Sequence, residues 1–109
     1  MRLPRGKIKE LCIELWMWCM ETGKRKEQWP RWGEFGYIHG HCWFCYYDTH
    51  TVAGDNRIGG GYCTYCPYRE KFGHCTKPGN FYDHWDKAET PRTRKKYAKL
   101  FLEQIKQTV

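Results

Sequence analysis

Four cysteines in the middle of the chain have the spacing of a metal site. Cys42 and Cys45 form one Cys-x-x-Cys pair, and Cys63 and Cys66 form a second. Seventeen residues lie between the two pairs, which is within the range of a four-thiolate zinc site. Two intervening residues let both sulfur atoms of a pair turn to the same side of a tight loop, each about 2.3 Å from a shared ion. The glycine-rich segment 54–61 supplies the turns that bring the second pair back to the first. We therefore expect a structural Zn²⁺ ion bound by these four thiolates on a short hairpin or ribbon.

The cysteine pattern leaves some alternatives open and argues against others. Iron suits a tetrahedron of thiolates as well as zinc does, and Cys66-Pro67 resembles a rubredoxin-like knuckle. Cys75 is a further thiol that could replace Cys63 or Cys66 as a ligand or lie beside the site. A thioredoxin-like site would require a βαβ pattern, and a zinc deaminase would require His-x-Glu followed by Pro-Cys-x-x-Cys. Neither pattern is present, so a closed structural site is favoured over a catalytic one.

The length and the cysteine count indicate a single domain, residues 1–109, in a reducing compartment. A chain of 109 residues has room for a modest core, which a metal ion would reinforce. Seven cysteines are an odd number for a disulfide framework, so we expect a cytoplasmic protein. The apolar run 11–20 is interrupted by Glu14 and is too short to cross a bilayer. We expect neither export nor membrane insertion.

The net charge of +7 is unevenly distributed along the chain. Residues 1–31 carry 8 basic and 4 acidic side chains, residues 32–86 carry 4 and 6, and residues 87–109 carry 7 and 2. Phosphate backbones are bound by Lys and Arg, so the acidic central segment is not expected to bind nucleic acid. Aromatic residues make up 17% of the chain, more than so small a core buries easily, and exposed rings would mark a binding surface.

Helices are predicted at both ends of the chain. Apolar residues recur at three- and four-residue spacing from Lys7 to Glu21, which predicts a helix that ends at Gly23. Cys12 and Cys19 are expected to be core residues of this helix. A basic turn, 24–26, and an extended Trp29-Pro30 strap follow. A short helix is expected from Phe81 to Ala88.

The last helix begins with Thr90 at the N-cap and Pro91 at the first helical position, and it is expected to run to about Gln107. Its predicted buried stripe consists of Tyr97, Ala98, Phe101, Leu102 and Ile105. Its predicted basic face consists of Arg92, Arg94, Lys95, Lys96 and Lys99. This face supports an alternative function, a zinc-stabilised module that binds nucleic acid.

A nuclease is a third hypothesis. Asp83-His84 invites comparison with HNH-type nucleases, in which zinc knuckles brace a histidine-bearing ββα unit. The remaining histidine and asparagine of such a site have no recognisable counterparts here, and a lone helical histidine is usually structural.

The order of these motifs resembles that of small cysteine-rich proteins of bacteriophages and prophages. The resemblance covers most of the chain and depends on Leu15-Trp16, the Trp-Pro strap, the two Cys-x-x-Cys pairs, Cys75, Trp85-Asp86-Lys87-Ala88 and Thr90-Pro91. Acidic residues commonly follow the Thr-Pro pair in that group, whereas Arg92 and Thr93 stand here. Some such metalloproteins are similar to anti-CRISPR inhibitors of type II effector nucleases. The resemblance implies a counter-defence protein that binds its target without catalysis.

The sequence as a whole thus predicts a small α+β zinc-stapled domain, with a metal-bound knuckle or hairpin core flanked by N- and C-terminal helices. The expected function is that of a non-enzymatic phage-type inhibitor whose partner is a bacterial defence nuclease. No catalytic residue is predicted.

Overall fold

The computed structural model describes residues 4–36, 41–44, 46, 67–73, 75 and 77–108. Within these ranges the chain forms two long helices and several short ones. The long helices are α1 (Arg5–Thr22) and α6 (Pro91–Lys106). The short elements are the 3-10 helix η1 (Lys26–Gln28) and the α-helices α2 (Trp32–Phe35), α4 (Pro67–Phe72) and α5 (Phe81–Lys87).

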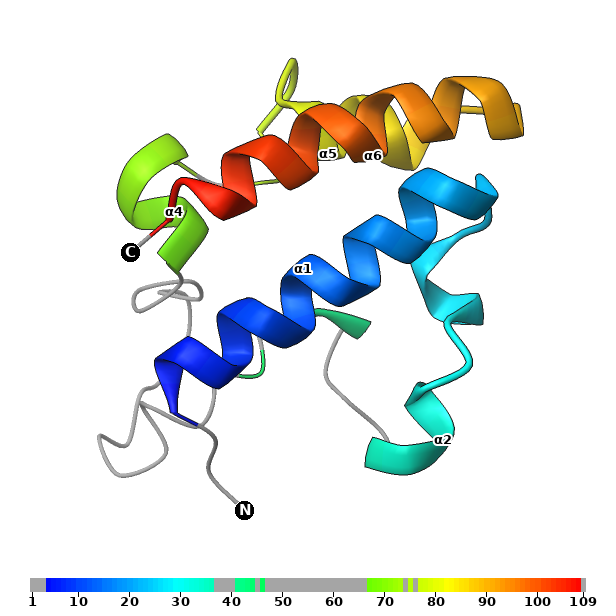
Figure 1. Ribbon diagram of the computed structural model, residues 1–109. Helices are drawn as coiled ribbons and strands as arrows, with labels where there is room; N and C mark the ends of the chain where they lie inside the picture. Colours follow the sequence, from blue (N-terminus) through cyan, green and yellow to red (C-terminus); the bar gives the residue numbers. More distant parts are fainter. Residues whose placement is uncertain are drawn as a thin grey trace, which may run out of the picture.

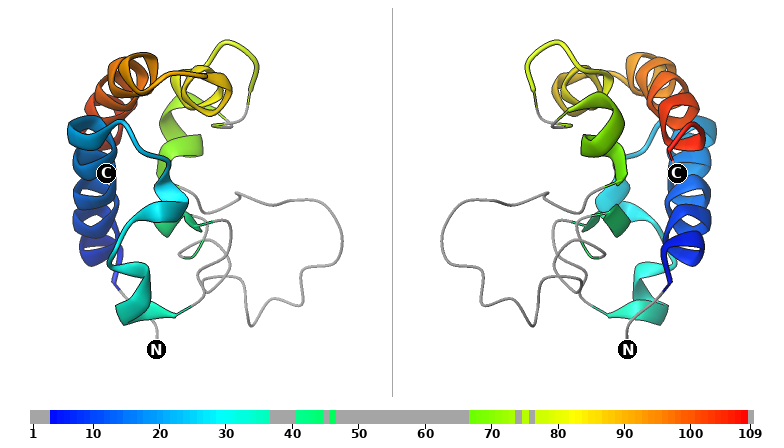
Figure 2. Two further views of the ribbon diagram at one scale, coloured as in Figure 1. Left: turned by 90° about the vertical axis from the view of Figure 1, so that its right-hand side faces the viewer. Right: turned by 90° about the vertical axis from the view of Figure 1, so that its left-hand side faces the viewer.

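The two long helices lie side by side and antiparallel (Figure 1). At one end of the pair, the Lys9 ammonium near the start of α1 donates a hydrogen bond to the carbonyl of Thr108, just after α6, over 2.6 Å. At the other end, Gly23 after α1 lies against Pro91 at the start of α6. Figure 2 shows α4 and α5 on one side of this pair. The core therefore lies between the α1–α6 layer and the short helices that cover one of its faces.

Helix α1 forms where the apolar spacing predicts it. Ile8, Leu15 and Cys19 are completely buried on one face. Gly23 ends the helix in the left-handed conformation, φ 71°, and its N–H donates to the carbonyl of Cys19 over 2.9 Å. Glycine is favoured there because a Cβ atom is strained at positive φ. The predicted extent of this helix and its stop at Gly23 are confirmed.

Helix α6 has the predicted N-terminus. The Thr90 hydroxyl accepts a hydrogen bond from the Thr93 N–H over 3.2 Å, and Pro91 follows at the first helical position. Ala98 and Ile105 are completely buried, and Tyr97 is half-buried. The predicted buried stripe of this helix is confirmed.

Trp16 is at the centre of an aromatic cluster that joins α1, α5 and α6. Its ring packs edge-on against Trp85 of α5 and Phe101 of α6, each with ring centroids 4.7 Å apart. Tyr82 of α5 also contacts it edge-on at 5.9 Å. Edge-to-face packing brings the positive edge of one ring to the negative face of another, which adds to the free energy gained by burying the rings. The short helix α5 is therefore held to the long pair by large side chains.

The predicted α+β fold is wrong. No strand occurs in the part of the chain that the structure describes, and most of those residues are helical. The described core consists of helical apolar stripes and aromatic rings. The segment 47–66, where the hairpin was expected, lies outside the described residues, and the chain after Cys66 forms helix α4.

The basic turn 24–26 is only partly exposed. Lys24 is in solvent, but Lys26, the first residue of η1, is buried. The Lys26 ammonium donates to the Tyr82 hydroxyl over 2.7 Å and lies 4.8 Å from the centroid of the same ring. The basic turn is therefore not wholly solvated, because a lysine can be buried when its charge reaches a hydroxyl and an aromatic face.

Burial of Cys19 predicts that the protein loses stability in alkali. Removal from water raises the pKa of this thiol from 9.0 to about 12. Between these values the thiol ionises in the unfolded chain but stays protonated in the folded one, so the free energy of unfolding falls by up to about 1.4 kcal/mol per pH unit. We expect urea denaturation to show a steeper loss between pH 9 and 10.5 for the wild type than for Cys19→Ala. Equal slopes for the two proteins would contradict this prediction.

No helix within the described ranges has the length and apolar character required to cross a membrane.

Candidate functional site

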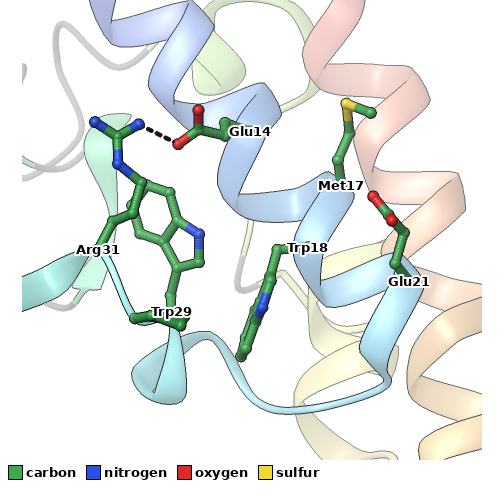
Figure 3. A pocket seen from close by; sticks show the side chains of 7 residues that line it. Glu14, Met17, Trp18, Glu21, Trp29 and Arg31 are labelled. Carbon is green, nitrogen blue, oxygen red and sulfur yellow. Dashed lines mark hydrogen bonds and ion pairs between the residues drawn. The ribbon is translucent and has the colours of Figure 1, made fainter.

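An open groove runs between α1 and the segment that connects η1 to α2 (Figure 3). We call this segment, residues 29–31, the strap, and the groove the α1–strap groove. Glu14, Met17, Trp18 and Glu21 form one wall, and Trp29, Pro30 and Arg31 form the other. The four α1 residues follow the i, i+3, i+4, i+7 spacing that places side chains on one face of a helix. The groove has a volume of about 360 Å³, and its walls are mostly carbon.

The apolar side chains of the groove differ in exposure. Trp29 is buried and holds the strap to the core, with its ring edge-on to Trp32 at 5.0 Å. Trp18 is half-buried, and Met17 is 41% exposed, which is the largest exposure of any large apolar side chain in the described part of the molecule. Partly exposed Trp and Met side chains around a concavity are characteristic of protein-binding surfaces.

Arg31 fixes the strap against α1. Its guanidinium forms a hydrogen-bonded ion pair with Glu14 of α1, drawn as the dashed line in Figure 3. The same guanidinium binds both carboxylate oxygens of Glu34 in α2, over 2.9 Å and 3.2 Å. These bonds raise the pKa of Arg31 above its ordinary value and lower that of Glu34, so both groups stay charged at neutral pH. One wall of the groove is therefore positioned by ion pairs that join three elements.

Glu21 is the carboxylate of the groove that is not paired in this way. No ion pair or hydrogen bond of its side chain occurs within the described ranges, and the residue is exposed. The groove thus contains two glutamates and a single arginine, which already binds a third glutamate nearby. The net charge of the residues that line the groove is therefore negative, although the protein as a whole carries +7.

A second candidate surface is the outer face of α6. Arg92, Lys95, Lys96 and Lys99 are exposed there, opposite the buried stripe. Lys96 lies over the Tyr97 ring at 5.2 Å from its centroid. Arg92, Lys95 and Lys99 form no ion pair with any carboxylate in the described structure. Unpaired cations at i, i+3 and i+7 of one helix form a stripe that could lie along an anionic polymer.

Arg94 does not belong to this basic face, which corrects the prediction. Its Nε–H donates to the carbonyl of Gly23 over 2.7 Å, and a terminal N–H donates to the carbonyl of Ala88 over 3.3 Å. The Arg94 side chain therefore crosses from the first turn of α6 to the carboxyl end of α1, where its charge is favourable for the α1 dipole. It connects α1, α6 and the α5–α6 turn.

We expect Arg94→Met to destabilise the protein by about 1–2 kcal/mol, because it removes two charge-assisted hydrogen bonds from partly buried carbonyls. Urea denaturation monitored by circular dichroism measures this loss. Lys95→Met, next to it on the exposed face, serves as the control and should change stability by less than about 0.5 kcal/mol. Equal effects of the two substitutions would show that Arg94 has no structural role.

The predicted metal ligands are only partly described. Cys45, Cys63 and Cys66 lie outside the described residues, and no group of three or more potential metal-binding side chains occurs within them. Cys42 is half-buried and directly precedes Trp43 and Phe44, which are both core residues.

Cys75, the thiol whose role the sequence leaves open, lies near Tyr82, as does Cys42. Burial raises the pKa of the Tyr82 hydroxyl above its ordinary value, and Cys42 and Cys75 act in the same direction whereas Lys26 opposes them. Both cysteines also pack against the aromatic core. Cys42 and Cys75, which are 33 positions apart in the sequence, therefore both act on the same tyrosine.

Asp83 and His84, on which the nuclease hypothesis depends, both contact neighbouring groups. The imidazole of His84 stacks on Tyr97 of α6, with ring centroids 4.9 Å apart and planes at 18°. The Asp83 carboxylate binds the Lys87 ammonium and accepts a hydrogen bond from the Gly79 N–H. The two side chains thus have structural contacts, His84 with α6 and Asp83 with Lys87 of α5 and the turn before it.

The α1–strap groove was not identified from the sequence. The excess of aromatic residues indicated that exposed rings would occur, but not which rings. Arg31 and Glu14 are 17 positions apart, and nothing in their local sequence pairs them.

No protein-family model, curated protein or solved structure matches this chain.

Proposed function

We propose that this protein is a non-enzymatic inhibitor of the phage type, which binds a bacterial defence nuclease, with a type II CRISPR effector as the first target to test. The observation that carries the proposal is the α1–strap groove. A concave surface with exposed Met17 and Trp18, fixed by the ion pairs of Arg31, is preorganised for a protein partner. The motif order that resembles cysteine-rich phage proteins supplies the choice of target.

The test is a titration of target cleavage by a purified type II nuclease loaded with its guide. We expect inhibition to saturate near one equivalent of this protein. Trp18→Ala should weaken inhibition by about thirtyfold, the effect of removing a central aromatic contact. A triple substitution of Arg92, Lys95 and Lys99 by alanine is the control and should leave inhibition unchanged. No inhibition at large excess would rule out this target, and inhibition that survives Trp18→Ala would rule out the groove as the contact.

The proposal retains a structural zinc ion, with Cys42, Cys45, Cys63 and Cys66 as ligands and Cys75 as the candidate to replace one of the last two. The packing of Cys42 and Cys75 against the same aromatic core supports keeping Cys75 as a candidate. We expect about one equivalent of zinc in the purified protein by elemental analysis, and iron would be detected in the same measurement. Cys75→Ser should lower the metal content if Cys75 is a ligand. Full metal content in Cys42→Ser would contradict the site.

A second candidate function is nucleic-acid binding by the outer face of α6. The observation that favours it is the stripe of Arg92, Lys95 and Lys99, whose charges no described carboxylate neutralises. Affinity for DNA or RNA should then fall steeply with salt, and replacing all three residues by alanine should reduce the slope of log K against log [salt] by about 3. An affinity that does not depend on salt, or an unchanged slope, would remove this candidate.

A further inference from the structure

We infer that the α1–strap groove recognises an arginine side chain of the partner protein, with the guanidinium stacked on Trp18 and paired with Glu21. This inference rests on the proposed protein-binding function and specifies the chemistry of the contact. It follows from the charge of the groove and from two arginine sites in the same chain, one of which forms the opposite wall of the groove.

The groove is locally acidic on a basic protein. Glu14 is neutralised by Arg31, whereas Glu21 has no ionic partner in the described part of the chain. A carboxylate beside a low-polarity wall is less screened by water than one on an open surface, so a cation is attracted to it more strongly. A partner with a positive side chain complements this end of the groove, and an acidic partner does not.

The protein twice combines an arginine with a tryptophan face and a carboxylate. The Arg25 guanidinium lies 4.8 Å from the centroid of Trp85 and binds the Asp86 carboxylate over 2.6 Å. The Arg31 guanidinium lies 5.7 Å from the centroid of Trp29 and binds Glu14 and Glu34. In both cases the guanidinium lies within cation–π distance of the ring while its N–H groups bind carboxylate oxygens.

At Trp18 and Glu21 the ring and the carboxylate are present but the arginine is not. These residues are three positions apart on α1 and line the same groove (Figure 3). Trp18 is half-buried, so part of its ring is accessible. An arginine from a partner would complete the combination that the chain builds internally at Trp85 and Trp29. Lysine is a poorer occupant, because its ammonium is a compact, strongly hydrated charge that does not stack.

Met17 indicates what accompanies the arginine. Its side chain is 41% exposed beside Trp18 and Glu21, so an apolar residue next to the arginine would cover it. The occupant is therefore a surface segment of the partner in which an arginine follows or precedes an apolar residue.

The experiment uses the whole protein and the blocked dipeptide acetyl-Leu-Arg-amide, followed by the NMR signal of the Trp18 indole N–H, which Trp18→Phe assigns. We expect a saturable shift with this dipeptide, a weaker one with acetyl-Leu-Lys-amide, and none with the citrulline analogue, which is similar in shape but uncharged. Glu21→Gln should raise the dissociation constant at least about fivefold. Glu10→Gln is the control, because Glu10 is exposed on α1 but does not line the groove.

The inference is overturned by an unchanged Trp18 signal, by an equal shift with the citrulline analogue, or by unaltered binding of Glu21→Gln. A Trp18 shift that depends on protein concentration alone would assign the groove to self-association and also overturn it. The dipeptide assay contains no nuclease, so its failure is distinct from failure of the inhibition assay. Arginine binding without inhibition would refute the proposed target, and inhibition without arginine binding would refute only this inference.

Discussion

Trp85→Ala is expected to destabilise the protein by about 3–5 kcal/mol, the largest effect of any single substitution considered in the described core. Trp85 is completely buried, packs edge-on against Trp16 and stacks on Tyr82 at 5.7 Å. The guanidinium of Arg25 covers its ring. Removal of the indole leaves a cavity where α1, α5 and α6 meet. This loss is a large share of the about 5–15 kcal/mol by which a domain of this size is stable, so the melting temperature should fall markedly.

The matched variant Trp85→Phe separates packing from hydrogen bonding. The indole nitrogen of Trp85 is buried without a hydrogen-bond partner in the described structure, so phenylalanine sacrifices no hydrogen bond there. Phenylalanine also keeps part of the volume of the indole ring. We therefore expect Trp85→Phe to lower the free energy of unfolding by less than half as much as Trp85→Ala does. Urea denaturation followed by circular dichroism measures both losses. Equal losses would mean that the indole N–H is bonded in solution and that the core is packed differently.

The second large effect is expected for Gly23→Ala. Gly23 has φ 71°, and a Cβ atom built there would lie 2.9 Å from both Cβ and the carbonyl oxygen of Pro91. The left-handed backbone disfavours alanine by about 1–2 kcal/mol. The contact with Pro91 would force the end of α1 away from the start of α6, at a cost of about 1–3 kcal/mol more. The carbonyl of Gly23 would also move relative to Arg94, which donates to it.

Gly73→Ala is the control for the backbone contribution. Gly73 follows α4 with φ 83°, and its N–H donates to the carbonyl of Arg69, as Gly23 does to Cys19 after α1. Apart from its chain neighbours, no atom of the described residues lies within 4 Å of a Cβ built at Gly73. Gly73→Ala should therefore show the backbone contribution alone, about 1–2 kcal/mol. If thermal or urea denaturation shows the same loss for both variants, the close approach of α1 to α6 at Gly23 does not contribute to stability.

Features set by local sequence were predicted well. The apolar spacing gave the extent of α1 to within two residues, and the Thr90-Pro91 pair gave the start of α6. Cys12 and Cys19 are core residues as expected. The fold class was not predicted, because the two Cys-x-x-Cys pairs directed attention to a metal-bound hairpin while the described core is built from helices. Proposed ligands other than Cys42 lie outside the described residues, so the zinc site stays a prediction.

The amino-acid sequence by itself determined the two long helices, their caps and the side chains they bury, because helical periodicity and capping act over three to seven neighbouring residues. Only the tertiary structure decided which polar groups meet. It pairs Arg31 with Glu14 to fix the groove, directs Arg94 to Gly23 rather than to solvent, and buries Lys26 against Tyr82. These contacts join residues 17, 71 and 56 positions apart. Whether a charged side chain remains in solvent or binds a distant group depends on how the helices pack, and no local pattern records that packing.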